Sequence, residues 1–140
     1  MPTTMTRSER EAYLAEPRVG IVAVEEPGRS PLAVPVWYSY EPGGPIRIMT
    51  ARHSRKTTLI ERSGQLSLVV QSDQAPYKYV AVQGTATIIG TSEESERRAL
   101  ARRYLGDEGG DEFMDATADA DDVTIELVPD VWRTGDYEKA

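Results

Sequence analysis

Alternation of hydrophobic and polar residues along the chain predicts six strands separated by turn sequences. The strands are expected at residues 19–24, 32–40, 46–50, 66–71, 77–89 and 122–128. Glu-Glu-Pro-Gly at 25–28 and Pro-Gly-Gly-Pro at 42–45 have the composition of tight turns. The fifth strand is expected to bend at Gly84, and the sixth to end at Pro129. Because strands joined by such short turns pair antiparallel, the pattern predicts an antiparallel sheet.

Capping signals predict two short helices in the first half of the chain. Ser8 and Glu11 have the spacing of a capping box, and the helix that they open should stop near Pro17. Ser54 is a good N-cap and Gly64 a good C′ residue, so a second short helix should lie between them.

A longer helix is expected after the fifth strand. Thr91 and Glu94 form another capping-box pattern, and the helix should run to about Leu105. Its spacing predicts an inner stripe made of Ala99, Leu100, Tyr104 and Leu105. A looser acidic helix is expected over residues 111–118.

These elements predict one mainly β (α+β) domain over residues 1–140, built as a six-stranded antiparallel barrel with short flanking helices. Closure is expected because it removes the edges that an open sheet would expose, and a plain α+β sandwich is the alternative. Pro35 cannot donate to a strand ladder, which predicts an edge or bulge at that point. Five aromatic residues exceed what such a core needs and suggest a subunit interface or ligand cleft: Trp37, Tyr38, Tyr77, Tyr79 and Trp132.

Composition narrows the functional classes. The chain carries 23 Asp or Glu and 16 Lys or Arg, a net charge of -7, which disfavours general binding to nucleic acid or anionic membranes. It has no cysteine, so disulfides, thiolate nucleophiles and cysteine-based metal sites are excluded. No apolar run approaches a membrane span and the start lacks an apolar signal region, so a cytoplasmic location is expected.

The helix expected after Ser54 has the chemistry of an anion site. Its first turn would carry Arg55 and Lys56, and cations at a helix N-terminus oppose the helix dipole. A bound phosphate would resolve this conflict, because it would take both the cations and the free amides. The sequence therefore predicts a phosphate at the start of this helix.

The same residues carry a family resemblance. The triplet Ser54-Arg55-Lys56 after a strand, and Val-Ala-Val-Gln-Gly-Thr-Ala at 80–86, resemble the pyridoxamine 5′-phosphate oxidase-like superfamily of FMN-binding split barrels. The resemblance covers residues 9–132. The compact length and the Trp-Tyr strand are most similar to its flavin/deazaflavin oxidoreductase branch. It implies a split barrel that forms a homodimer, with FMN or an 8-hydroxy-5-deazaflavin coenzyme bound across the interface.

Carried over residue by residue, the resemblance implies a set of cofactor contacts. Arg55 and Lys56 would hold the phosphate, with the second strand beside the ring and Trp132 closing the site. The full set is Val36, Trp37, Tyr38, Thr50, Ser54, Arg55, Lys56, Tyr79 and Trp132. The C-terminal Arg and His residues with which the oxidase itself grips pyridoxal phosphate have no counterparts here.

The resemblance implies an oxidoreductase that transfers a hydride between the bound cofactor and a small organic substrate. No residue stands out as catalytic and no metal site is expected, because His53 is the only histidine and the acidic residues lack metal-ligand partners. One alternative is a non-catalytic FMN- or haem-binding protein, a sensor or carrier on the same fold. A ligand-free structural dimer is the other. Neither the substrate nor the choice between FMN and deazaflavin follows from the sequence.

Overall fold

One antiparallel sheet of seven strands forms the body of the molecule in the computed structural model, which describes residues 3–140. The strands are β1 (Gly20–Val24), β2 (Leu32–Val36), β3 (Tyr38–Tyr40), β4 (Ile46–Ala51), β5 (Gln65–Gln71), β6 (Lys78–Thr91) and β7 (Asp122–Asp136). They are ordered β2-β1-β5-β6-β7-β4-β3. The helices are α1 (Arg7–Ala15), α2 (Arg55–Ser63) and α3 (Glu94–Ala116), followed by the short 3-10 helix η1 (Tyr137–Lys139).

The barrel closes because the segment 32–40 changes partner at Trp37. Its first part, β2, pairs with β1, whereas its second part, β3, pairs with β4 at the other end of the sheet order. The predicted single strand is therefore two strands, which raises the expected six strands to seven. The prediction of a mainly β antiparallel split barrel is confirmed. Pro35 lies in β2, at the end of the sheet order, as its missing amide required.

The interior is filled from alternate positions on the strands and from α1 and α2. In β2 and β3 the inward side chains include Val36, Tyr38 and Tyr40, which share one face as the alternation predicted. The largest fully buried side chains are Tyr38, Leu14, Ile46, Ile48, Leu59, Ile60, Leu68, Ile125, Leu127, Val22, Val70 and Val80. This apolar core holds the surrounding strands in place.

Gly84 sets the bend of the long strand pair β6 and β7. The pairing register shifts between Gln83 and Gly84, as the expected bend at this glycine indicated. A Cβ atom on Gly84 would lie 1.8 Å from the carbonyl oxygen of Val128, so only glycine fits there. The expected end of the last strand at Pro129 is wrong, because β7 continues beside β6 as far as Asp136.

The two short helices differ in how well their caps were predicted. Ser54 caps α2 and Gly64 ends it with φ 71°, both as expected. The capping box of α1 is formed by Thr6 and Glu9 rather than by Ser8 and Glu11, so the helix begins two residues earlier.

α3 consists of two limbs joined at Gly106, where φ is 79°. The predicted capping box at Thr91 is wrong, because Thr91 still belongs to β6 and pairs with Val123 of β7. The predicted inner stripe is partly wrong as well, since Ala99 and Leu105 are exposed. Leu100 is buried as expected, and the second limb contains the acidic helix that the sequence predicted.

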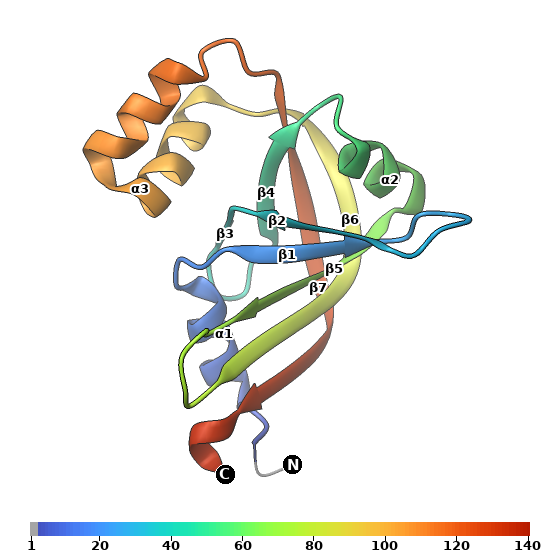
Figure 1. The fold of residues 1–140 in the computed structure, drawn as a ribbon, viewed down its shortest axis with the longest axis vertical. Coiled ribbons are helices and arrows are strands. Elements are labelled where there is room, and N and C mark those ends of the chain that lie inside the picture. The colour runs from blue at the N-terminus through green and yellow to red at the C-terminus, as the bar shows by residue number, and fades with distance from the viewer. Residues whose placement is uncertain (1–2) are drawn as a thin grey trace.

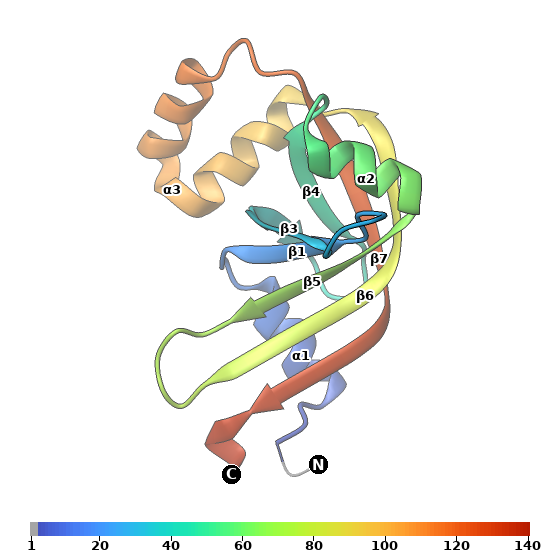
Figure 2. The same ribbon diagram turned by 45° about the vertical axis from the view of Figure 1, so that its right-hand side comes forward.

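Figure 1 shows the two limbs of α3 beside the upper end of β4, with α2 on the opposite side of that strand. α1 lies at the lower part of the barrel, and the C-terminal end of β7 lies below it, near the start of the described chain (Figure 2). The amide of Asp136 donates a hydrogen bond to the carbonyl of Thr3 at 2.7 Å, which ties these ends together. Within residues 3–140, no helix combines the length and the apolar character needed to cross a bilayer.

Candidate cofactor site

A cavity of about 430 Å³ opens at the break between β2 and β3, between α2 and the second limb of α3. Four of the residues implied as cofactor contacts meet here: Val36, Trp37, Thr50 and Lys56. The remaining lining residues are Val19, Pro35, Met49 and Phe113. The cavity thus has one cationic end at α2 and an otherwise mostly apolar lining.

Trp37 forms one wall of this cavity and is held by both limbs of α3. Its ring stacks on Tyr104 of the first limb, with centroids 5.0 Å apart and planes 5° from parallel. On the second limb, the ring centroid of Phe113 lies 5.2 Å from that of Trp37, and the two ring planes make an angle of 50°. Phe113 also lines the cavity and is 37% exposed. The sequence did not single out Phe113, because it is one apolar residue within an acidic run.

Tyr38 follows the break, and its side chain points away from the cavity into the core. Its hydroxyl donates a hydrogen bond to the carbonyl of Leu14 at 2.7 Å. Burial raises the pKa of Tyr38 well above its ordinary value, so the hydroxyl keeps its proton. The resemblance implied a backbone contact for this strand, but the Tyr38 amide already donates to the hydroxyl of Tyr104 at 3.1 Å, so it has a partner within the chain.

The start of α2 presents free backbone donors next to the cavity. The side-chain oxygen of Ser54 accepts from the amide of Thr57 at 3.3 Å, which satisfies one of the first amides of the helix. Thr57 in turn donates its hydroxyl proton to the carbonyl of Ala51 at 2.8 Å, which fixes the loop before the helix. The amides of Arg55 and Lys56 have no acceptor within the helix, because such acceptors would have to precede its first turn.

Lys56 supplies the charge at this end of the cavity. It is half-buried, and within residues 3–140 it has no carboxylate close enough for an ion pair. Burial lowers the pKa of Lys56, and the charge of Asp122 acts in the other direction. A partly buried ammonium without a paired acid beside free helix amides is suited to bind a phosphate.

Arg55, the other implied phosphate ligand, does not line the cavity. Its guanidinium contacts the carboxylate of Glu26, with Nη2 and Oε2 2.6 Å apart. The Glu26 side chain is only 13% exposed, so this pair joins α2 to the β1–β2 turn. His53 also lies outside the cavity, with its side chain 85% exposed and 3.8 Å from Asp121.

Tyr79 and Trp132 are not brought to this cavity within one chain. Tyr79 packs beside Gly135, where an added Cβ would lie 2.4 Å from its ring. The guanidinium carbon of Arg10 lies 4.4 Å from the Trp132 ring centroid, and Tyr40 packs against the same ring edge-on. Both residues therefore belong to other parts of the barrel surface.

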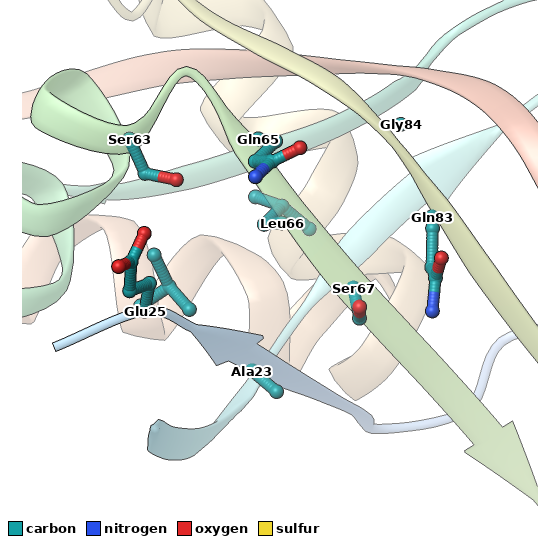
Figure 3. A pocket seen from close by; sticks show the side chains of 9 residues that line it. Ala23, Glu25, Ser63, Gln65, Leu66, Ser67, Gln83 and Gly84 are labelled. Atoms are coloured by element: carbon teal, nitrogen blue, oxygen red, sulfur yellow. The ribbon is translucent and has the colours of Figure 1, made fainter. Parts of the chain in front are cut away.

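A separate polar hollow lies between the C-terminal end of α2 and strands β1, β5 and β6. Figure 3 shows the side chains of Glu25 and Ser63 at one end of it, near Gln65, with Ser67 and Gln83 farther along. None of the implied cofactor contacts lines this hollow. Its polar lining also lacks the cation that a phosphate would require.

Comparison with known proteins identifies the fold. The family model described as pyridoxamine 5′-phosphate oxidase matches residues 6–135. A conserved hypothetical protein from Mycobacterium tuberculosis superposes with a TM-score of 0.76 at 22% identity, covering 99% of this chain and 89% of that one. No curated protein matches the chain.

Two other similar structures are proteins named for a cofactor that they use or bind. An F420 reductase has a TM-score of 0.68 at 21% identity, covering 88% of this chain and 94% of that chain. The FAD and haem binding protein from Mycobacterium smegmatis has a TM-score of 0.67 at 15% identity, covering 97% and 73%. At these identities the likeness establishes the fold that this chain shares with them.

Proposed function

The chain belongs to the pyridoxamine 5′-phosphate oxidase family, and from this premise we propose that it is a flavin- or deazaflavin-dependent oxidoreductase. The cofactor, FMN or an 8-hydroxy-5-deazaflavin coenzyme, would occupy the cavity beside Trp37 and Lys56. The observation that carries the proposal is Lys56, a partly buried cation without an acid partner in residues 3–140, next to the free amides of α2. Among similar structures, one is an F420 reductase and another an FAD and haem binding protein.

The residues present fit the two ends of such a cofactor. Lys56 and the first amides of α2 would hold the phosphate, with the Thr50 hydroxyl nearby. The flat ring would lie along Pro35, Val36 and Trp37, where one edge of β2 has no strand partner and its backbone can bond ring heteroatoms. A cavity of about 430 Å³ is within the range usual for small-molecule sites.

A bound flavin or deazaflavin supplies the hydride chemistry, and the protein supplies position and environment. Trp37, Met49 and Phe113 would exclude water from the reacting face, since their side chains form the apolar part of the lining. Lys56 is the only residue with an ordinary titratable side chain among those lining the cavity. We therefore assign no general acid, and expect substrates whose reduction needs none from the protein. Nothing in this cavity favours haem, because His53 lies outside it.

The cofactor assignment is tested by titration. FMN and an 8-hydroxy-5-deazaflavin coenzyme are added separately to the wild type, to Lys56→Gln and to the control Arg29→Gln. Arg29 is exposed and lines neither this cavity nor the polar hollow. Loss of a charge-assisted contact to phosphate should weaken binding of the preferred cofactor about tenfold or more in Lys56→Gln alone. Unchanged affinity in Lys56→Gln would refute the site.

Turnover separates the oxidoreductase from a non-catalytic carrier. The loaded protein is mixed with a reducible test compound and a reductant for the cofactor, and oxidation of the cofactor is followed by its absorbance. Reoxidation that depends on the test compound supports an enzyme. A protein that binds its cofactor tightly but shows no such dependence with any acceptor tried would be the carrier.

We also propose that the protein is a homodimer, paired through the outer face of the sheet. The pairing register aligns an apolar row across this face, made of Pro35, Ile21, Val69 and Ala81. Ile21 is 39% exposed although it is large and apolar. Because Pro35 also lines the cofactor cavity, a second copy on this face would border the site. That continuity favours a second copy as the partner over an unrelated protein.

Light scattering tests the dimer. The wild type should give twice the chain mass of 15.5 kDa, and an obligate interface should bury about 2,000 Å² or more. Ala81→Glu should give monomers, whereas Ala12→Glu, a matched change on the exposed side of α1, should remain dimeric. A monomeric wild type would refute the shared interface.

A further inference from the structure

Another cavity, of about 310 Å³ and lined by both charged and apolar residues, lies between α1, the β3–β4 turn and the middle of β7. It shares no lining residue with the candidate cofactor cavity. Arginines from α1 line one side, and aromatic rings from β3 and β7 line another. The lining residues that carry the argument are Arg7, Arg10, Glu11, Tyr40, Glu126 and Trp132.

Arg10 is a cation without an acid partner in the part of the chain that the structure describes. Its guanidinium carbon lies 4.4 Å from the centroid of the Trp132 ring, so the group is held against an aromatic face. Its Nε atom is buried and makes no hydrogen bond within residues 3–140. Because solvent does not reach this Nε atom, a ligand in the cavity can meet Arg10 only at its terminal nitrogens.

The acids of the cavity already have other partners. Glu11 pairs with Arg7, with Oε2 and Nε 3.5 Å apart. Glu126 pairs with Arg47, which lies outside the cavity lining. The positive charge of Arg10 is therefore the one that remains uncompensated among the described residues of this cavity.

Tyr40 provides a second donor at the same cavity. The only hydrogen bond of its hydroxyl within residues 3–140 is one that it accepts, from the amide of Gly43 at 3.4 Å. Burial raises the pKa of Tyr40, so the hydroxyl keeps its proton and can donate it. Neither Arg10 nor Tyr40 has an acceptor for these donors within residues 3–140, and both side chains pack against the ring of Trp132.

We propose that this cavity binds a small carboxylic acid with a flat apolar body. The carboxylate would accept from the terminal guanidinium nitrogens of Arg10, which are not buried as Nε is, and from the hydroxyl of Tyr40; both groups lack an acceptor within residues 3–140. The flat body would pack in the apolar part of the cavity, where Val128 and Pro129 accompany Trp132. Benzoate has this chemistry and is small enough for the cavity.

Calorimetric titration of the full-length protein with benzoate tests the site. Wild type should bind benzoate, and Arg10→Met should bind at least about tenfold more weakly, because methionine keeps packing against Trp132 but removes the charge. Arg29→Met, an exposed arginine outside the cavity, should bind as wild type does. Benzyl alcohol, which keeps the ring but lacks the carboxylate, should bind more weakly than benzoate. Equal affinity of Arg10→Met and wild type would overturn the proposal, as would equal binding of the two probes.

Two further measurements keep the result clear. Tyr40→Phe removes one donor without removing the ring, and should weaken benzoate binding several-fold even if Arg10→Met fails to fold. Saturating FMN should leave the benzoate affinity unchanged, because the two cavities share no lining residue. Unchanged benzoate affinity in Tyr40→Phe, or competition between FMN and benzoate, would contradict the assignment of a separate site.

Discussion

The hydroxyl of Tyr104 takes the place of a neighbouring strand for the backbone of Tyr38. It accepts from the Tyr38 amide at 3.1 Å and lies 3.1 Å from the Tyr38 carbonyl oxygen. It also lies 2.8 Å from the carbonyl of Arg18, and its single proton can go to either oxygen. A side chain of α3 therefore satisfies the backbone where β2 and β3 part.

Removing this hydroxyl should destabilise the fold although the aromatic stacking remains. Tyr104→Phe can still stack on Trp37, but it leaves the Tyr38 amide without an acceptor. We expect a loss of about 1–3 kcal/mol in the free energy of unfolding, measured by denaturant titration. Tyr77→Phe serves as the control, because Tyr77 is 56% exposed, and it should change stability little. Equal stability of Tyr104→Phe and wild type would show that water replaces the hydroxyl.

The ion pair of Arg55 with Glu26 predicts a different role for Arg55 than for Lys56. Arg55→Gln should weaken cofactor binding much less than Lys56→Gln does, because Arg55 lies outside the cavity lining. Arg55→Gln and Glu26→Gln should each lower stability slightly, and the double variant should lose little more than either alone. Cofactor titrations of wild type, Arg55→Gln and Lys56→Gln measure the first effect. Denaturant curves of wild type, the two single variants and the double variant measure the second. If Arg55→Gln binds cofactor as weakly as Lys56→Gln does, Arg55 leaves Glu26 to contact the phosphate.

Asp111 should make the joint between the two limbs of α3 sensitive to acid. Hydrogen bonds from Arg102 and then Arg98 lower the pKa of Asp111 from 3.8 to about 2. Since the folded-state pKa lies below the unfolded one, Asp111 stabilises the fold above about pH 4 and loses this effect as pH falls through about 2. Asp111→Asn should therefore be less stable than wild type at pH 7, and the difference should disappear near pH 2. Asp115→Asn, which removes an exposed acid of the same limb, is the matched control and should change stability little at pH 7.

Gly84→Ala should disrupt the bend of β6 and β7. The added methyl group would overlap the Val128 carbonyl, which is backbone and cannot rotate away. We expect a loss of at least about 2 kcal/mol of stability, or insoluble protein, measured by yield and melting curves. Gly109→Ala is the matched control, because the nearest atom to its new methyl group is a side-chain carbon at 3.2 Å. Similar melting temperatures for Gly84→Ala and wild type would contradict the close approach.

Local chemistry made part of the fold predictable from sequence. Ser54 and Gly64 cap α2 as expected, because a cap depends on a few neighbouring residues. The break at Trp37 was not predictable, since the alternation continues through it and only the pairing partner changes. Thr91 had the local signal of an N-cap, but its pairing with Val123 in the sheet prevailed.

The residues of the candidate site also fall into those that the sequence could predict and those that it could not. Lys56 and Thr50 could be proposed from the sequence because they flank a recognisable helix start, and both line the cavity. Phe113 could not, because its position depends on the turn of α3 at Gly106 and on the stacking against Trp37. Those contacts join parts of the chain that have no shared local pattern.

The break at Trp37 also makes the length of the chain between β2 and β3 a determinant of the barrel. These strands lie at opposite ends of the sheet order, so one covalent connection sets where the two ends meet. Deleting one residue there would move one end by about 3.3 Å relative to the other and turn its side chains to the opposite face. Tyr38 and Tyr40 would then face outward. Insertions and deletions at this point should therefore be far less tolerated than in the exposed turn at Gly28, where even an added Cβ would have no atom within 4 Å.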